Sequence, residues 1–107
     1  MITSSRLDYR DSVVGAFKET RDALGAYSEA KSTLQSAQRR SQALARAAEF
    51  TRIRADGGES SRLDVFNADR LALTAQAQSA DAARALTEAQ ANVFRALGGG
   101  WHVSSLH

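Results

Sequence analysis

Residues 52–71 read Arg-Ile-Arg-Ala-Asp-Gly-Gly-Glu-Ser-Ser-Arg-Leu-Asp-Val-Phe-Asn-Ala-Asp-Arg-Leu and predict a tight reversal of the chain. Gly57 and Gly58 can adopt a positive φ and so end a helix, because glycine lacks a Cβ. Ser61 and Asp64 follow in a capping-box pattern, in which a hydroxyl and an acid three residues later bond free backbone N–H groups. The stretch therefore predicts a helix, a turn at about residues 56–61, and a second helix.

Both flanks of this turn favour long helices. Proline is absent and 21 of the 107 residues are alanine, which has the highest helix propensity. A second capping-box pattern at Ser5 and Asp8 predicts a first helix over about residues 5–55. The second helix should cover about residues 62–97 and stop at a glycine triplet, leaving a loosely held tail at 98–107. We expect one all-α region over residues 1–107, a long antiparallel hairpin similar to a coiled coil.

Apolar residues on each expected helix recur at spacings near three and four, which indicates one narrow apolar stripe per helix. On the first helix the stripe comprises Val13, Phe17, Leu24, Tyr27, Leu34, Ala45 and Ala48. On the second helix it comprises Phe66, Leu73, Ala80, Ala83, Phe94 and Leu97. Long helices gain most of their stability from packing, and one partner covers only one stripe. We therefore expect the hairpin to associate into a helical bundle, as dimers or higher oligomers.

The composition excludes several classes of protein. Without cysteine there are no disulfides and no thiolate metal sites. No run approaches the roughly 20 apolar residues of a spanning helix. The N-terminal residues do not form a basic-then-apolar signal peptide, so the export signal of an exported protein would lie on residues outside this sequence. We expect a fragment of a longer protein or a remnant gene.

The residues also argue against an enzyme. His102 and His107 lie beyond the expected helices, with no carboxylate or cysteine at ligand spacing. No serine lies in a nucleophile elbow, and the glycine pair at the turn lacks the lysine and the strand of a phosphate loop. We predict no catalytic residue, no metal and no cofactor.

Basic residues outnumber acidic ones close to the turn. The basic residues are Arg39, Arg40, Arg46, Arg52, Arg54 and Arg62, against Glu49, Asp56 and Glu59. Such a patch can bind nucleic-acid phosphates, but it is also typical of the solvated face of a long helix. We favour the solvated face and expect no nucleic acid, because the whole chain has a net charge of only +2.

Two motifs at a fixed spacing resemble a known family. The first is the Gly-Gly break followed by Ser61 and Leu63-Asp64-Val65, and the second is Phe94-Arg95-Ala96-Leu97-Gly98-Gly99-Gly100-Trp101. Together they resemble the last helical hairpin of the TolC-type outer-membrane efflux proteins, most closely the lipoprotein branch often labelled NodT or OprM. The segment at residues 14–24 is similar to the family's sequence near the middle of the channel, so the resemblance covers about residues 7–101.

The resemblance implies a function in transport. Family members form trimers with a long α-helical tunnel in the periplasm, and they passively export substrates delivered by an inner-membrane pump through a periplasmic adaptor protein. The full-length protein would lie in the outer membrane and periplasm, and this fragment alone would be soluble. The rival hypothesis is a free-standing soluble coiled-coil hairpin that serves as a protein interaction module. A nucleic-acid-binding hairpin is a third, weaker hypothesis.

The resemblance also assigns roles to the turn, which in the family forms the periplasmic tip of the tunnel. The residues matched to adaptor docking are Gly57, Gly58, Ser61, Leu63 and Val65. The residues matched to the pore entrance are Asp64, Asn67 and Ala55. Ala55 replaces a common tyrosine and Asn67 a common aspartate, so Asp64 alone would supply the acidic ring at the entrance.

Overall fold

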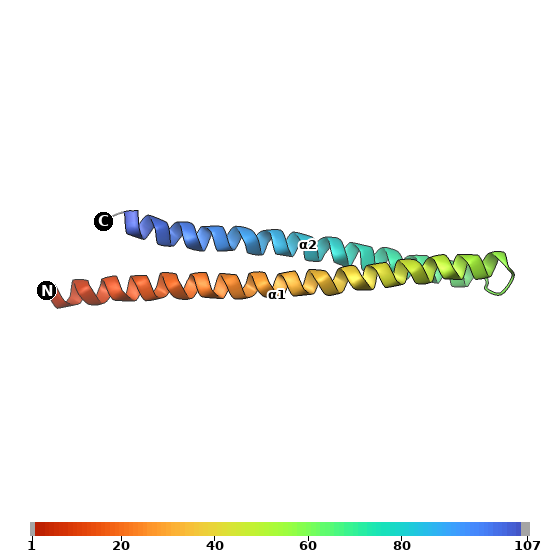
Figure 1. Ribbon diagram of the computed structural model, residues 1–107, viewed down its shortest axis with the longest axis horizontal. Coiled ribbons are helices and arrows are strands. Elements are labelled where there is room, and N and C mark those ends of the chain that lie inside the picture. The colour runs from red at the N-terminus through yellow and green to blue at the C-terminus, as the bar shows by residue number, and fades with distance from the viewer. Residues whose placement is uncertain (1, 106–107) are drawn as a thin grey trace. The chain divides into compact units, whose positions relative to one another are not determined.

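The computed structural model describes the backbone of residues 2–105 and the side chains of residues 13–98. This described part contains two helices and no strand: α1 spans Ile2–Asp56 and α2 spans Arg62–Ser105. Figure 1 shows that the two helices run in opposite directions and are joined by one turn. The predicted all-α helical hairpin is confirmed.

Both helices extend beyond their predicted ends. α1 begins at Ile2 instead of near residue 5, and the side chains of its expected capping box lie outside the described part. α2 continues through Gly98-Gly99-Gly100 to Ser105, so most of the expected tail is helical. Each glycine costs a helix about 1 kcal/mol relative to alanine, but glycine keeps the backbone donor that proline lacks. A glycine triplet therefore weakens the helix without ending it.

The chain divides into two compact units along the hairpin. The turn unit consists of residues 31–85 and holds the turn with the adjoining segments of both helices. The terminal unit consists of residues 1–30 and 86–107, which are the start of α1 and the end of α2. This division follows from a hairpin of long helices, in which a residue contacts only neighbours at its own level.

The contact between the helices is made mostly by small residues. Most buried or half-buried positions recur at alternating steps of three and four, the spacing of a two-helix coiled-coil seam. We call these positions the inner seam. On α1 they are Ala16, Thr20, Ala23, Tyr27, Ala30, Leu34, Ala37, Ser41, Leu44, Ala48, Thr51 and Ala55. On α2 they are Val65, Ala68, Ala72, Ala75, Ser79, Ala82, Leu86, Ala89, Val93 and Ala96.

Alanine forms the most buried part of this seam. Ala48 and Ala75 are each 2% exposed and Ala89 is 8% exposed, and they are the buried apolar residues of the described part. The distance between packed helices depends on the side chains at the contact. An alanine seam therefore lets α1 and α2 approach closely.

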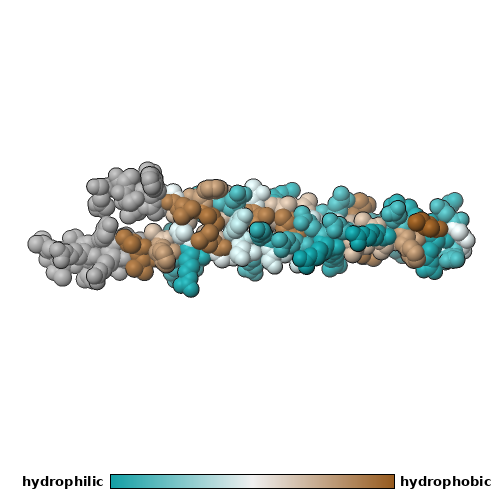
Figure 2. All heavy atoms as spheres, in the orientation of Figure 1, coloured by the Kyte–Doolittle hydropathy of each residue, from teal (hydrophilic) through white to brown (hydrophobic). Residues whose placement is uncertain are grey.

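The predicted apolar stripes are wrong for most of their members. Tyr27, Leu34 and Ala48 lie on the inner seam as expected, whereas the other predicted positions are exposed. On α2 the whole predicted stripe lies one residue farther round the helix than the inner seam. Because alanine, serine and threonine occupy most of the close contact, twelve large apolar side chains of the described part are left exposed. Figure 2 shows such apolar residues as exposed brown areas among the polar surface.

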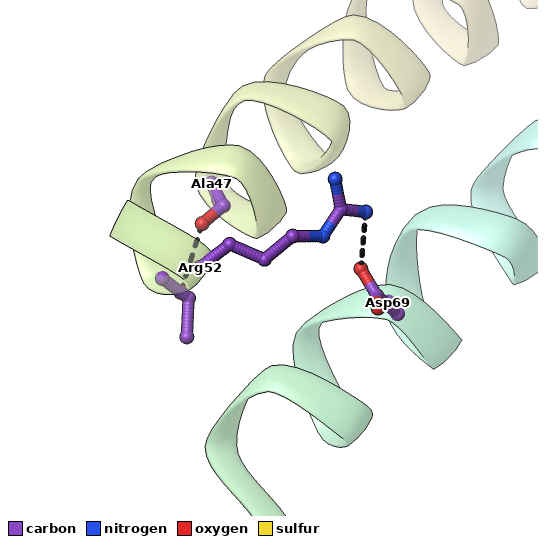
Figure 3. A network of polar contacts seen from close by, with 4 residues as sticks. Ala47, Arg52 and Asp69 are labelled. Carbon is purple, nitrogen blue, oxygen red and sulfur yellow. Dashed lines mark hydrogen bonds and ion pairs between the residues drawn. The ribbon is translucent and has the colours of Figure 1, made fainter. Parts of the chain in front are cut away.

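Threonines in the seam bond to their own helix. The Thr51 hydroxyl donates to the Ala47 carbonyl oxygen at 2.8 Å (Figure 3), and the Thr20 hydroxyl donates to the Ala16 carbonyl oxygen at 3.0 Å. This bond to the residue four positions back satisfies a hydroxyl without a partner on the other helix. Threonine can therefore replace alanine in the seam without leaving an unpaired polar group.

Candidate functional site

The turn begins with a hydrogen-bonded helix end. The Gly58 N–H donates to the Ala55 carbonyl oxygen at 3.0 Å, and the Glu59 N–H donates to the Arg54 carbonyl oxygen at 2.8 Å. Gly58 has a φ of 81°, the positive value at this end that favours glycine. Together these features make a Schellman motif, in which Gly58 follows the last helical residues. Of the two glycines expected to end α1, Gly58 is the one with a positive φ, a conformation that residues with a Cβ rarely adopt.

The second helix begins with the predicted capping box. The Asp64 N–H donates to the Ser61 hydroxyl oxygen at 3.1 Å, and the Ser61 N–H donates to the Asp64 carboxylate at 3.1 Å. This reciprocal pair satisfies two backbone donors that the first turn of α2 leaves free. The carboxylate also lies at a helix N-terminus, where the helix dipole favours negative charge. Asp64 therefore has a structural role, whatever it does at a pore entrance.

The candidate docking and entrance residues occupy two different environments. Leu63 is 66% exposed, and Asp64 and Asn67 are exposed as well. Val65 and Ala55 are half-buried on the inner seam. Val65 and Ala55 therefore contribute mainly to the contact between the helices. The side chains that a partner can reach are the exposed ones, Leu63, Asp64 and Asn67.

Two arginines near the turn have acidic partners. The Arg52 guanidinium contacts the Asp69 carboxylate at 2.8 Å, which links α1 to α2 in the turn unit (Figure 3). Arg54 lies 3.7 Å from the Glu59 carboxylate and 5.8 Å above the Phe50 ring. All four charged side chains are more than a third exposed, so each pair stabilises the fold by about 0–1 kcal/mol.

The sequence analysis missed the pair between Arg52 and Asp69. The sequence did contain a pattern that indicates this pair: Arg52 directly follows the inner-seam residue Thr51 on α1, and Asp69 directly follows Ala68 on α2. Residues beside the seam of an antiparallel coiled coil commonly pair across it. A correct assignment of the inner seam would have predicted this contact.

An open groove of about 580 Å³ runs along the same edge of the turn unit. Its lining comprises Ser41, Gln42, Ala45, Ala48, Glu49 and Arg52 of α1 with Asp69, Ala72, Leu73 and Gln76 of α2. Three of the lining residues are alanines, and Leu73 has 66% of its surface exposed. The ion pair between Arg52 and Asp69 lies within this lining. The groove thus offers an apolar side chain and small residues next to polar ones.

The described side chains contain no group of three or more histidine, cysteine or acidic residues that could hold a metal ion. No buried side-chain nitrogen or oxygen atom among them lacks a hydrogen-bond partner.

Neither helix, over its described residues, is long and apolar enough to span a membrane.

Comparison with known proteins identifies a family. The family model described as outer membrane efflux protein matches residues 2–99. The match includes the turn and nearly all of both helices. No curated protein matches the chain, and no solved structure does.

Proposed function

The chain belongs to the outer membrane efflux protein family, and on this premise we propose that it forms part of the wall of a periplasmic α-helical tunnel. Proteins of this family are channels of the outer membrane rather than enzymes. The tunnel would conduct substrates passively after an inner-membrane pump has delivered them. The observation that carries this proposal is the extent of the match, which at residues 2–99 spans the turn and nearly all of both helices.

The exposed apolar side chains of the hairpin support the proposal that it packs against other helices. Twelve large apolar side chains are exposed on the described part. They are Val13, Val14, Phe17, Leu24, Phe50, Ile53, Leu63, Phe66, Leu71, Leu73, Phe94 and Leu97. Exposed apolar surface on this scale is typical of an interaction site. We infer that the hairpin associates with further copies, as trimers in a complete channel and as dimers or higher oligomers on its own.

The turn would form the periplasmic tip. In this proposal Leu63 contacts the periplasmic adaptor protein, and Gly58 and Ser61 fix the backbone that presents it. Asp64 and Asn67 would lie at the pore entrance, where a single carboxylate per subunit attracts cations. Ala55 and Val65 would support the tip through the inner seam. The exposure of Leu63 beside a hydrogen-bonded turn supports a docking role.

The proposal is tested by changing the tip within a complete efflux channel that contains this hairpin. Leu63→Arg should abolish efflux, measured as drug susceptibility, because it places a charge in a packed contact. The channel should remain in the outer membrane, because Leu63 is mostly exposed in the hairpin. Arg62→Ala, at the neighbouring exposed position, is the matched control and should leave efflux unchanged.

Asp64 is tested separately by single-channel conductance. Asp64→Asn should keep the channel assembled, since an amide oxygen can still accept the Ser61 N–H, but it should weaken cation attraction at the entrance. Added salt should shrink the difference by screening. Normal efflux with Leu63→Arg would show that the turn is a plain connection without a docking role, and unchanged conductance with Asp64→Asn would remove Asp64 from the entrance.

A further inference from the structure

The terminal unit has two broad faces, one on each side of the inner seam. One residue corresponds to about 100° around a helix, so residues that directly follow a seam residue lie on one face of an antiparallel pair. Residues that directly precede a seam residue lie on the other. We call these the following face and the preceding face. A pocket of about 200 Å³ agrees with this geometry, because its lining includes Leu24 of α1 and Phe94 of α2, each of which directly follows a seam residue.

The following face carries bulky apolar side chains. Four of them are at least half exposed: Phe17, Leu24, Phe94 and Leu97. Val14 lies three residues before Phe17 and extends the same face, with 66% of its surface exposed. Apolar side chains gathered on one face are more stable when another surface covers them.

The preceding face of the same unit carries acidic side chains and, among its described residues, no large apolar one. Four exposed acidic residues directly precede seam residues: Glu19, Asp22, Glu29 and Glu88. They are all the acidic residues among the described side chains of this unit, residues 13–30 and 86–98. Arg95 is the one basic residue on this described face, so four negative charges and one positive charge give it a net charge of −3. Because a buried charge without a partner is costly, this face requires water.

These two faces need different surroundings in the wall of a tunnel. One broad face of a hairpin in such a wall is turned toward the interior, and the other is turned outward. A protein cover over the interior side would obstruct the path of the substrate. The face that needs a cover must therefore be the outward one, and the face that needs water can line the path.

We propose that the preceding face of the terminal unit lines the water-filled interior of the tunnel and that the following face is turned outward. This inference rests on the proposed function, and it adds a second acidic stretch of wall to the proposed entrance. The turn unit, taken by itself, has the same relation between seam and pore. Asp64 and Asn67, the proposed entrance residues, directly precede the seam residues Val65 and Ala68.

Thiol labelling of a complete channel that contains this hairpin tests the orientation. Tyr27 lies on the inner seam, and the two residues beside it, Ala26 and Ser28, are both small and exposed. The hairpin has no cysteine of its own, so Ala26→Cys and Ser28→Cys each add one thiol to it. A positively charged methanethiosulfonate reagent is then added during single-channel recording in bilayers. We expect a stepwise loss of conductance for Ala26→Cys, because the reacted thiol adds bulk and charge to the path, and no loss for Ser28→Cys or the parent channel.

The ion selectivity of the same channel provides an independent measurement. Replacing Asp22 by Asn together with Glu29 by Gln should lower the permeability ratio of potassium to chloride at least about twofold, because fixed charges in a cleft concentrate counter-ions. Reversal potentials in a salt gradient measure this ratio. Arg21→Gln is the matched control, because Arg21 directly follows a seam residue. Its charge would lie outside the path and be screened over about 8–10 Å, so the ratio should hardly change.

The outcomes separate this orientation from the proposed function. Loss of conductance with Ser28→Cys, with both cysteine variants or with neither would overturn the orientation. An unchanged permeability ratio after the double replacement, or an equal change with Arg21→Gln, would overturn it as well. All of these results come from a channel that conducts, so they leave the proposed function intact. A complete channel that does not conduct at all would count against the proposed function itself.

Discussion

Two neighbouring glycines at the turn should respond to the same substitution with opposite signs. Gly58 has a φ of 81°, and a Cβ placed there would meet no atom within 4 Å. The cost of Gly58→Ala is therefore purely conformational, about 1–2 kcal/mol for the left-handed backbone. The reduced freedom of the unfolded chain offsets about 0.4–1 kcal/mol of this cost. We expect a net loss of about 1 kcal/mol in the free energy of unfolding.

Gly57→Ala is the matched control. Gly57 does not share the positive φ of Gly58, and its added Cβ would lie in ordinary contact, 3.6 Å from the Arg54 carbonyl oxygen. Alanine also reduces the freedom of the unfolded chain relative to glycine, so this variant should be stabilised by about 0.4–1 kcal/mol. At about 4–8 °C per kcal/mol for a small domain, the melting temperatures of the two variants should differ by roughly 10 °C.

The assay is thermal unfolding followed by circular dichroism. All variants are compared at one protein concentration, because the melting temperature of any self-associating protein depends on concentration. Gly58→Asn should lose less stability than Gly58→Ala, since asparagine tolerates this conformation better. A shift of the same sign for Gly57→Ala and Gly58→Ala would show that the turn does not depend on the positive φ of Gly58.

Three further changes test the packing and the cap. Ala75→Leu should destabilise the hairpin by about 1–3 kcal/mol through overpacking, whereas Ala77→Leu on the exposed face should be nearly neutral; equal thermal shifts would contradict the inner seam. Ser61→Ala should cost about 0.5–2 kcal/mol by removing the cap, measured by urea unfolding, and an unchanged midpoint would show that the cap contributes nothing. A double-mutant cycle on Arg52 and Asp69 should give a coupling of no more than about 1 kcal/mol that falls with added salt; a larger, salt-independent value would indicate a buried pair.

The turn was predictable because its chemistry is local. The positive φ of Gly58 and the reciprocal bonds between Ser61 and Asp64 involve residues within one or two turns of helix. Each residue type there has a strong positional preference, so the sequence alone placed the end of α1 and the start of α2. The roles of these residues at a tunnel tip depend on partners and stay predictions.

The packing was harder to predict, because the largest apolar side chains are not the ones that form the contact between the helices. Phe66 and Leu73 dominate any apolar pattern on α2, yet they lie outside while Ala68, Ala72 and Ala75 form the contact. The useful signal was the regular alternation of three and four among small residues. Helix propensity also predicted the wrong end for α2 at the glycine triplet, because a low propensity lowers the stability of a helix without removing a backbone hydrogen bond.

The alanine seam has a consequence for calorimetry. The heat-capacity change of unfolding grows with the apolar area exposed, by about 0.45 cal/mol/K per Å². Alanine side chains release little such area when α1 and α2 separate, so the isolated hairpin should fall below the usual 12–15 cal/mol/K per residue. A small heat-capacity change flattens the dependence of stability on temperature. Cold denaturation should therefore lie far below the freezing point of water.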